Sequence, residues 1–242
     1  MSNEIERLLV AGASGDTGRE LLRQLRSVDV QVRAMTRSPN KERELSEEGA
    51  DEVIVGDLLD PADASRAVAD CDAVLCAVGS SPSLDALLGG DLVDGAGVEN
   101  LVYAAVAAGV EGFVFESSIG VGDSREGMPA ALRLPLWHVL NQKNHAESVL
   151  RTSGLSYTII RPGGLTNAPA TGNVLVGEGG ESVSGSIPRE DVARLMIAAL
   201  FTSDAENRTF EVVSREGQRG TARGVVEIDW QVPGEHEIEI EE

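Results

Sequence analysis

Three glycines at three-residue spacing stand near the start of the chain, at Gly12, Gly15 and Gly18, between the apolar run 8–11 and a helical repeat of leucines over 21–25. Between a strand and a helix, glycines permit a tight turn, close approach of the backbone to a diphosphate, and close helix–strand packing. Unpaired N–H groups at the helix start favour an anion. The spacing predicts a dinucleotide-binding loop, although an ordinary glycine-rich turn uses the same residues. The predicted contacts in this loop are Gly12, Ser14, Gly15, Asp16, Thr17 and Gly18.

The residues after the second predicted strand bear on which dinucleotide is bound. Thr36, Arg37 and Ser38 stand there, and none of them is a carboxylate. An acidic residue at this place would accept from the ribose 2′-hydroxyl of NAD, whereas an arginine accommodates the 2′-phosphate of NADP. Arg37 can form a paired contact with phosphate and Ser38 adds a hydroxyl donor. We therefore expect NADP(H) in preference to NAD(H); a solvated arginine without a ligand is the alternative.

Two carboxylates near these loops need separate interpretations. Asp57 and Leu58 follow the third predicted strand, where the aspartate side chain and the next N–H are placed to meet the adenine edge. Alternatively, Asp57 caps a turn. Asp16 would repel a diphosphate, so we expect its side chain to point outward, where it complements the helix dipole.

Strand and helix patterns alternate along most of the chain and must position these loops. Strands are predicted over 8–11, 30–35, 53–55, 73–78, 113–115 and 157–160. Helices are predicted after the glycine loop and over 40–48, 61–68, 91–108, 136–151 and 189–200. The alternation predicts an α/β fold with a parallel sheet, helices on both faces and ligands beyond the carboxyl ends of the strands. Past residue 217 the pattern changes: 225–230 is compatible with a strand, and 235–242 is an acidic tail.

The charge of the chain is strongly negative, with 40 acidic and 20 basic residues among 242 and a formal net charge of −20. Only Lys41 and Lys143 are lysine, and the remaining basic residues are arginine. Such a surface is typical of proteins kept soluble in concentrated salt, so we expect a halophilic source. A merely acidic protein is the alternative. Nucleic-acid binding needs a basic face, so a nucleic-acid partner is not expected.

The cysteine content and the apolar runs suggest a cellular location. Cys71 and Cys76 are the two cysteines of the chain, and their spacing fits neither a metal framework nor a redox motif, so we expect core thiols and no metal. The first residues lead into the first strand without the apolar segment of a signal peptide. No apolar run approaches the length of a membrane span. We therefore expect a cytoplasmic protein without a membrane partner.

A series of motifs extends these observations over residues 6–215. They are GASGDTG from Gly12, TRSP from Thr36, GDL from Gly56, AVGS from Ala77, DxxGxxN from Asp94, AAGVEGFVFESSIG from Ala107, KNHAE from Lys143, SYTIIRPGGL from Ser156 and IPREDVA from Ile187. Their order and spacing resemble the atypical short-chain dehydrogenase/reductases, in the NmrA-like and flavin/biliverdin-reductase-like branch. The resemblance implies a Rossmann-type doubly wound parallel sheet holding NADP(H), with a small C-terminal substrate region. It implies one domain over 1–217 with substrate-region segments near 162–188, followed by an acidic extension over 218–242.

The resemblance also names candidate catalytic residues. In the main branch of the superfamily a serine, a tyrosine and a lysine four residues later reduce carbonyls. Ser118 and Lys143 match the serine and the lysine, and Lys143 is also expected to contact the ribose, although an ordinary surface lysine is the alternative. The tyrosine position is Val139, so the usual proton donor is missing, and His138 or His145 is a candidate substitute acid unless merely exposed. Further predicted cofactor contacts are Ala77, Val78, Gly79, Pro162 and Gly163.

Three functions are compatible with this sequence. The first is an NADPH-dependent reductase of a small acceptor such as a quinone, a flavin or an activated carbonyl, because such reductions can draw their proton from solvent. The second is a non-catalytic NADP(H) sensor that binds a protein partner; a homodimer is compatible with either. The third is a nucleotide-sugar epimerase, which the missing tyrosine and the short substrate region disfavour. Ser118 and Lys143 favour the first function over the second.

Overall fold

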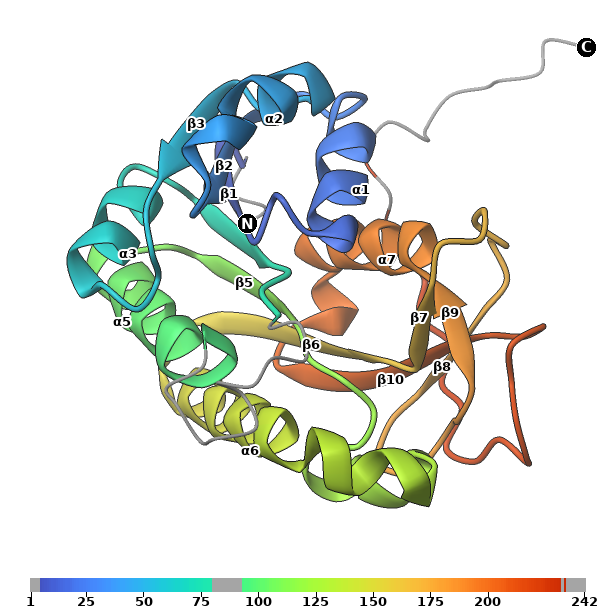
Figure 1. Ribbon diagram of the computed structural model, residues 1–242. Coiled ribbons are helices and arrows are strands. Elements are labelled where there is room, and N and C mark those ends of the chain that lie inside the picture. The colour runs from blue at the N-terminus through green and yellow to red at the C-terminus, as the bar shows by residue number, and fades with distance from the viewer. Residues whose placement is uncertain (1–4, 80–92, 232, 234–242) are drawn as a thin grey trace, which may run out of the picture.

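A central sheet organises the computed structural model, which describes residues 5–79, 93–231 and 233 (Figure 1). Within these residues the sheet has eight strands in the order β3-β2-β1-β4-β5-β6-β10-β8. Neighbouring strands are parallel, except that β8 runs antiparallel to β10. The strands are β1 (Arg7–Ala11), β2 (Gln31–Thr36), β3 (Glu52–Val55), β4 (Ala73–Cys76), β5 (Gly112–Glu116), β6 (Ser156–Pro162), β8 (Val174–Gly177) and β10 (Arg208–Ser214). β7 (Gly164–Thr166) and β9 (Ser186–Pro188) form a separate parallel pair.

Helices cover both faces of this sheet. One face carries α1 (Asp16–Leu25), α2 (Glu42–Glu48) and α7 (Arg189–Phe201), and the other carries α3 (Pro61–Val68), α5 (Val98–Ala108) and α6 (Ala130–Thr152) (Figure 1). Short helical segments are η1 (Pro39–Lys41), η2 (Val93–Gly97), η3 (Gly122–Gly127) and η4 (Ser203–Ala205). The architecture confirms the predicted Rossmann-type α/β fold with a small C-terminal region.

Local signals explain why these elements form where they do. Leu21, Leu22 and Leu25 of α1 are completely or almost completely buried, as expected for an amphipathic helix on a sheet. Asp60 caps α3, because its side chain accepts a hydrogen bond from the N–H of Ala62 at 2.9 Å. The buried leucines and the capping aspartate therefore account for the positions of α1 and α3.

Helix α6 begins earlier than the sequence indicates. It starts at Ala130, whereas the predicted helix starts at 136, directly after Pro135. A proline inside a helix removes one N–H donor and disfavours the helical conformation of the residue before it. Pro135 lies in the second turn, near the N-terminal end of the helix. The interruption is tolerated there, and the helix extends upstream of the proline.

The segment 225–230 does not form the strand with which its sequence is compatible. Val225 makes a single bridge to Gly177, and the backbone beyond it is irregular. The alternation is nevertheless real, because Val226, Ile228 and Trp230 pack against the core, with the Trp230 ring 5.6 Å from that of Phe210. Every second residue of this segment is therefore partly buried because its side chain packs against the core, although the segment forms no ladder of hydrogen bonds with a strand. The predicted loop over 80–90 and the acidic tail 235–242 lie outside the described residues.

Among the residues that the structure describes, no helix combines the length and the apolar character needed to cross a membrane. In the same residues, no group of three or more histidine, cysteine, aspartate or glutamate side chains is arranged to hold a metal ion.

The two cysteines are buried thiols. Cys71 is 4% exposed and Cys76 is fully buried, and burial raises their pKa to about 11 and about 12. Because the thiolate is the reactive form, we expect neither residue to react with a thiol reagent such as DTNB at pH 8 in the native protein. Absorbance should report two thiols only after denaturation. Rapid labelling of native protein would contradict this assignment.

Candidate functional site

A cleft of about 180 Å³ lies over the carboxyl ends of β1 to β4. This is the point at which the strand order reverses, between β1 and β4, and it is where open α/β sheets bind ligands. Four successive loops and η2 converge on it. The lining residues are Gly12, Ser14, Gly15, Met35, Thr36, Arg37, Gly56, Leu58, Ala77, Val78, Gly79 and Val93.

The three motif glycines occupy different environments. Gly12 has a φ of +81°, and a Cβ there would lie 2.5 Å from the carbonyl oxygen of Ala77. At Gly18 a Cβ would lie 2.3 Å from the carbonyl oxygen of Gly12. At Gly15 the one described atom within 4 Å is that same oxygen, at 3.3 Å. Backbone packing therefore requires glycine at 12 and 18, whereas Gly15 leaves a space open to the cleft that a side chain would fill.

Helix α1 begins at this open position. Gly15 is its N-cap and lines the cleft, so the first N–H groups, which have no acceptor within a helix, start there. The side chain of Asp16 is mostly exposed and points outward as expected, with its Oδ2 3.7 Å from Nε of Arg189. The Thr17 hydroxyl donates to Oε1 of Glu116 at 3.0 Å, which turns this side chain into the protein. The backbone of this turn, more than its side chains, is suited to an anion.

Arg37 is exposed at the rim of the cleft and makes no hydrogen bond or ion pair with the other described residues. Behind it, the Thr36 hydroxyl donates to Oγ of Ser14 at 3.2 Å and accepts from the N–H of Ser38 at 3.2 Å. These contacts tie the first two loops together. None of the described lining residues is acidic, in a chain with 40 acidic residues.

The loop after β3 is held from two sides. Oδ1 of Asp57 accepts from the N–H of Leu59 at 3.1 Å, which is the turn-capping alternative considered for this residue. Asn100 of α5 donates to the carbonyl oxygen of Leu58 at 2.9 Å. Leu58 lines the cleft, whereas Asp57 lies beside it.

Lys143 is buried, with 8% of the residue exposed. Its ammonium donates to the carbonyl oxygens of Val78 at 3.2 Å and Glu116 at 3.0 Å, and lies 3.5 Å from Oδ1 of the fully buried Asp94. It thereby joins the ends of β4 and β5 to η2. Lys143 does not line the cleft; these contacts hold the Val78 backbone that does.

The serine at the end of β5 has a neighbour with a different role. Ser118 is partly exposed, and its hydroxyl donates to the carbonyl oxygen of Ile119 at 2.9 Å. Ser117 is buried, and its hydroxyl donates to Oε1 of Glu147 at 2.5 Å. Of the two, Ser118 has the side chain accessible to a ligand.

The backbone at Pro162 and Gly163 is engaged within the protein. The carbonyl of Pro162 accepts from the N–H of Ile119 at 2.9 Å, and the N–H of Gly163 donates to the carbonyl of Val212 at 2.9 Å. A Cβ at Gly163 would lie 2.5 Å from the carbonyl oxygen of Gly185. Close backbone packing therefore accounts for the glycine at this position.

The cleft unites half of the residues predicted to contact a cofactor. Those that line it are Gly12, Ser14, Gly15, Arg37, Leu58, Ala77, Val78 and Gly79. Those outside its lining are Asp16, Thr17, Gly18, Ser38, Asp57, Lys143, Pro162 and Gly163. Of the second group, the first five residues belong to the same loops as the lining residues or follow them directly. Lys143, Pro162 and Gly163 lie toward the ends of β5 and β6.

Neither Tyr103 nor Tyr157 lines the cleft. Tyr103 is exposed on α5, and its hydroxyl donates to Oε1 of Glu99. Tyr157 stands near the amino-terminal end of β6, whereas the cleft lies over the carboxyl ends of β1 to β4. His145 is exposed beside Glu99, with Nε2 3.2 Å from Oε2.

Sequence reasoning missed two buried carboxylates, Glu116 and Glu147. Glu116 ends β5 and is 6% exposed, and its appearance in an otherwise apolar strand was the available signal. Glu147 on α6 is completely buried. Arg161 of β6 donates to both of its oxygens, from Nε at 2.9 Å and from Nη2 at 2.7 Å.

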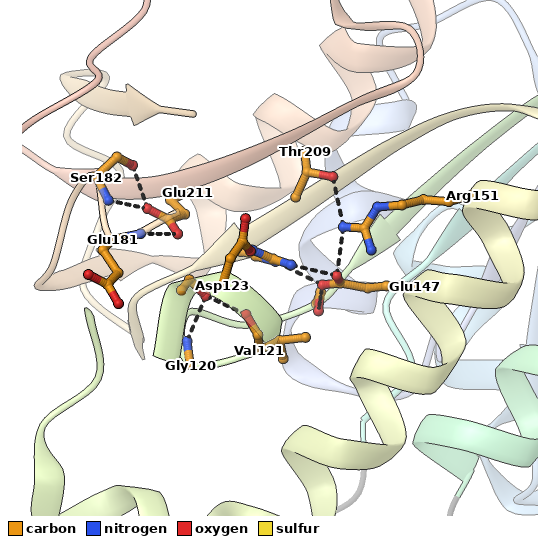
Figure 2. Close-up of polar contacts among 12 residues, drawn as sticks. Gly120, Val121, Asp123, Glu147, Arg151, Glu181, Ser182, Thr209 and Glu211 are labelled. Carbon is orange, nitrogen blue, oxygen red and sulfur yellow. Dashed lines mark hydrogen bonds and ion pairs between the residues drawn. The ribbon is translucent and has the colours of Figure 1, made fainter. Parts of the chain in front are cut away.

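Figure 2 shows the network around Glu147. Arg151 also donates to Glu147, at 2.8 Å, and to the hydroxyl of Thr209 at 3.1 Å, which links α6 to β10. Arg161 reaches onward to Asp123 in η3. In the same view, Glu211 of β10 accepts from the N–H groups of Glu181 and Ser182. The hydrogen bonds of Glu147, Arg151 and Arg161 thus join α6, β6 and β10.

The parallel sheet, the glycine loop at its switch point and the anion-compatible start of α1 define a dinucleotide-binding protein of the Rossmann type. The chain belongs to the NAD(P)H-binding family, which it matches over residues 12–203.

Several known proteins are similar to the chain. An uncharacterized sugar epimerase, YhfK, of Bacillus subtilis is 35% identical over 209 residues, covering 85% of this chain and 93% of that protein. Sanguinarine reductase of Eschscholzia californica is 28% identical over 254 residues, covering 89% and 91%. The solved structure of a putative NAD-dependent epimerase/dehydratase from Bacillus halodurans has a TM-score of 0.77 at 35% identity, covering 86% of this chain and 94% of that one.

Proposed function

We propose that this chain is an NADP(H)-dependent reductase of a small acceptor such as a quinone, a flavin or an activated carbonyl. The observation that carries the proposal is the cleft. Although the chain has a net charge of −20, the described cleft lining contains no carboxylate and one exposed arginine, Arg37. A cleft with a positive charge and no negative one suits a ligand with a diphosphate and a 2′-phosphate.

The residues present fit such a cofactor. The space at Gly15 and the start of α1 would accept the diphosphate, Arg37 and Ser38 the 2′-phosphate, and the loop at Leu58 the adenine. The nicotinamide half would then extend toward the ends of β5 and β6, where Ser118 is accessible. When bound, the cofactor supplies a hydride to the acceptor.

The protein side of the reaction is adapted to acceptors that need little acid catalysis. Val139 replaces the tyrosine, and the contacts of Lys143 make it a positioning residue for the ends of β4 and β5. Ser118 is available to orient an acceptor oxygen, and the proton comes from solvent. The similarity to a protein named a reductase supports this assignment.

A sensor function is the second candidate, and the engagement of Lys143 favours it. Its ammonium donates to the carbonyl oxygens of Val78 and Glu116 and lies 3.5 Å from Oδ1 of Asp94, and these contacts support a binding site without a part in catalysis. Epimerase activity, which the names of two relatives suggest, would require a proton-transfer group that the chain lacks at Val139.

We also propose one domain over 1–217, with substrate-region segments near 162–188 and an extension over 218–242. The small cluster of Met128, Leu140, Leu175, Val183 and Val213 supports this arrangement, because it packs Leu175 and Val183 of those segments against Leu140 of α6 and Val213 of β10. The described part of the extension lies against β8 and β10.

A panel of acceptors tests the reductase assignment. NADPH oxidation would be followed at 340 nm in concentrated KCl with quinones, flavins and activated carbonyls. We expect turnover with at least one class. If NADPH binds but no acceptor supports turnover, the sensor function is favoured.

Replacing Arg37 by aspartate should reverse the cofactor preference. One charge-assisted phosphate contact contributes about 1.5–3 kcal/mol, so we expect NADPH affinity to fall about tenfold to a hundredfold while NADH affinity is retained or improved. Parallel titrations with the two nucleotides measure this. Arg223→Asp makes the same charge change at an exposed position near β8 and should leave both affinities unchanged. An unaltered preference in Arg37→Asp would show that Arg37 is only a solvated surface residue.

We further propose that the protein works in a salt-rich cytoplasm. At a net charge of −20, self-repulsion opposes folding and is screened by salt. The melting temperature should therefore rise between 0.2 M and 3 M KCl, by about 2–4 °C for each kcal/mol gained. Differential scanning calorimetry measures the change. A melting temperature that is unchanged or lower in 3 M KCl would indicate an ordinary acidic protein.

A further inference from the structure

Glu116 is a buried carboxylate at the end of the strand next to the cleft. It closes β5, which pairs with β4, and the residues before it in the strand are glycine, phenylalanine and valine. Only 6% of Glu116 is exposed. Its Oε1 accepts a hydrogen bond from the hydroxyl of Thr17, in the first turn of α1, at 3.0 Å. The carboxylate is therefore connected directly to the turn at which an anion would bind.

Three helices bring polar side chains toward Glu116. Thr17 contributes its hydroxyl from α1, Lys143 its ammonium from α6 and Arg189 its guanidinium from the start of α7. Burial raises the pKa of Glu116, and the two cations and the Thr17 hydroxyl oppose that rise without cancelling it. Lys143 is shared with Asp94, and Arg189 with Asp16, so neither cation acts on Glu116 alone. The Cys76 thiol on β4 is neutral, because burial raises its pKa to about 12.

We propose that Glu116 couples nucleotide binding to proton uptake: a diphosphate at the start of α1 places negative charge beside the Thr17–Glu116 pair, and Glu116 takes up a proton in response. This inference rests on the proposed cofactor site.

The sign of the pH dependence follows from linkage. The nearby anion raises the pKa of Glu116 further in the complex than in the free protein. NADPH affinity is then independent of pH below the free-protein pKa, falls as pH rises between the free and bound values, and is again constant above them. In the falling range, one proton corresponds to about a tenfold loss of affinity per pH unit at most.

Calorimetric titration of the full chain with NADPH tests the coupling. Measuring the binding enthalpy in buffers of different ionisation enthalpy, from pH 6.5 to 9, gives the number of protons taken up. Glu116→Gln keeps the size of the side chain and removes its titration. We expect wild type to take up more protons than Glu116→Gln, by up to about one, and to lose affinity with pH more steeply. The 2′-phosphate itself titrates near pH 6, but it is identical in both experiments.

A second variant separates coupling from a structural role. Thr17→Val removes the hydroxyl that stabilises the Glu116 carboxylate, so the pKa of Glu116 should rise and the fall in NADPH affinity should move to higher pH. Equal proton counts in wild type and Glu116→Gln, or a pH profile that Thr17→Val leaves in place, would overturn the inference while leaving the cofactor site intact. If wild type binds no NADPH at any pH, the proposed function fails, and the inference fails with it.

Discussion

Gly15→Val is expected to abolish NADPH binding while the protein stays folded. A Cβ at this position meets one described protein atom within 4 Å, and the added methyl groups would occupy the space where α1 begins. Because the diphosphate needs backbone N–H groups at close range, we expect an affinity loss of at least about a hundredfold, or about 2.7 kcal/mol. Fluorescence titration with NADPH measures it, with Gly15→Ala giving an intermediate loss.

Gly18→Ala provides the matched comparison within the same motif. Its Cβ would lie 2.3 Å from the Gly12 carbonyl oxygen, inside contact distance of backbone that cannot move aside. This variant should lose stability, detected as a lower melting temperature, whereas Gly15→Val, whose Cβ would lie 3.3 Å from the same oxygen, should lose less. If Gly15→Val bound NADPH normally, the cleft would not be the diphosphate site.

Breaking the buried ion pair between Glu147 and Arg161 should give the largest loss of stability. Glu147 is completely buried and Arg161 is 3% exposed, so Glu147→Gln leaves a buried guanidinium with only the exposed carboxylate of Asp123 as an ionic partner among the described residues (Figure 2). Removing one member of such a pair costs about 3–5 kcal/mol. Urea unfolding at fixed KCl concentration measures the change.

Two further variants make this prediction specific. Glu178 forms a similar two-bond pair with Arg208, but both side chains are about one-third exposed, so Glu178→Gln should cost about 1 kcal/mol or less. Removing both buried charges in Glu147→Gln/Arg161→Met should recover part of the loss, because no unpaired buried guanidinium remains. Arg151 also loses its contact with Glu147, but its side chain is one-third exposed to solvent. Equal costs for Glu147→Gln and Glu178→Gln would contradict the role assigned to burial.

The parts of this protein that sequence predicts well depend on short-range chemistry. The glycine loop, the cap at Asp60 and the leucine face of α1 are each decided within about one helical turn. Arg37 was also accessible to prediction, because the end of a strand in a parallel sheet places the next side chain at the ligand edge.

The residues that sequence describes poorly depend on contacts between distant segments. Lys143 looked like a catalytic lysine, and its burial follows from carbonyl groups on β4 and β5 that lie 65 and 27 residues away. Gly163 is predicted as a cofactor contact, and the structure gives a second reason for glycine at this position, because a Cβ would lie 2.5 Å from the carbonyl oxygen of Gly185 in another segment. The short strands β7 to β9 have too few residues for a periodic signal. Strand β10 was also missed from the sequence; the adjacent Val212 and Val213 interrupt its alternation, and its last five residues are all buried.

We expect the cleft over β1 to β4 to bind NADP(H), with Arg37 selecting the 2′-phosphate. Equilibrium titration of wild-type protein with NADPH and with NADH, in concentrated KCl, tests it most directly. We expect saturable binding of NADPH at one site, about tenfold to a hundredfold tighter than NADH. Tighter binding of NADH, or no binding of either nucleotide, would contradict it.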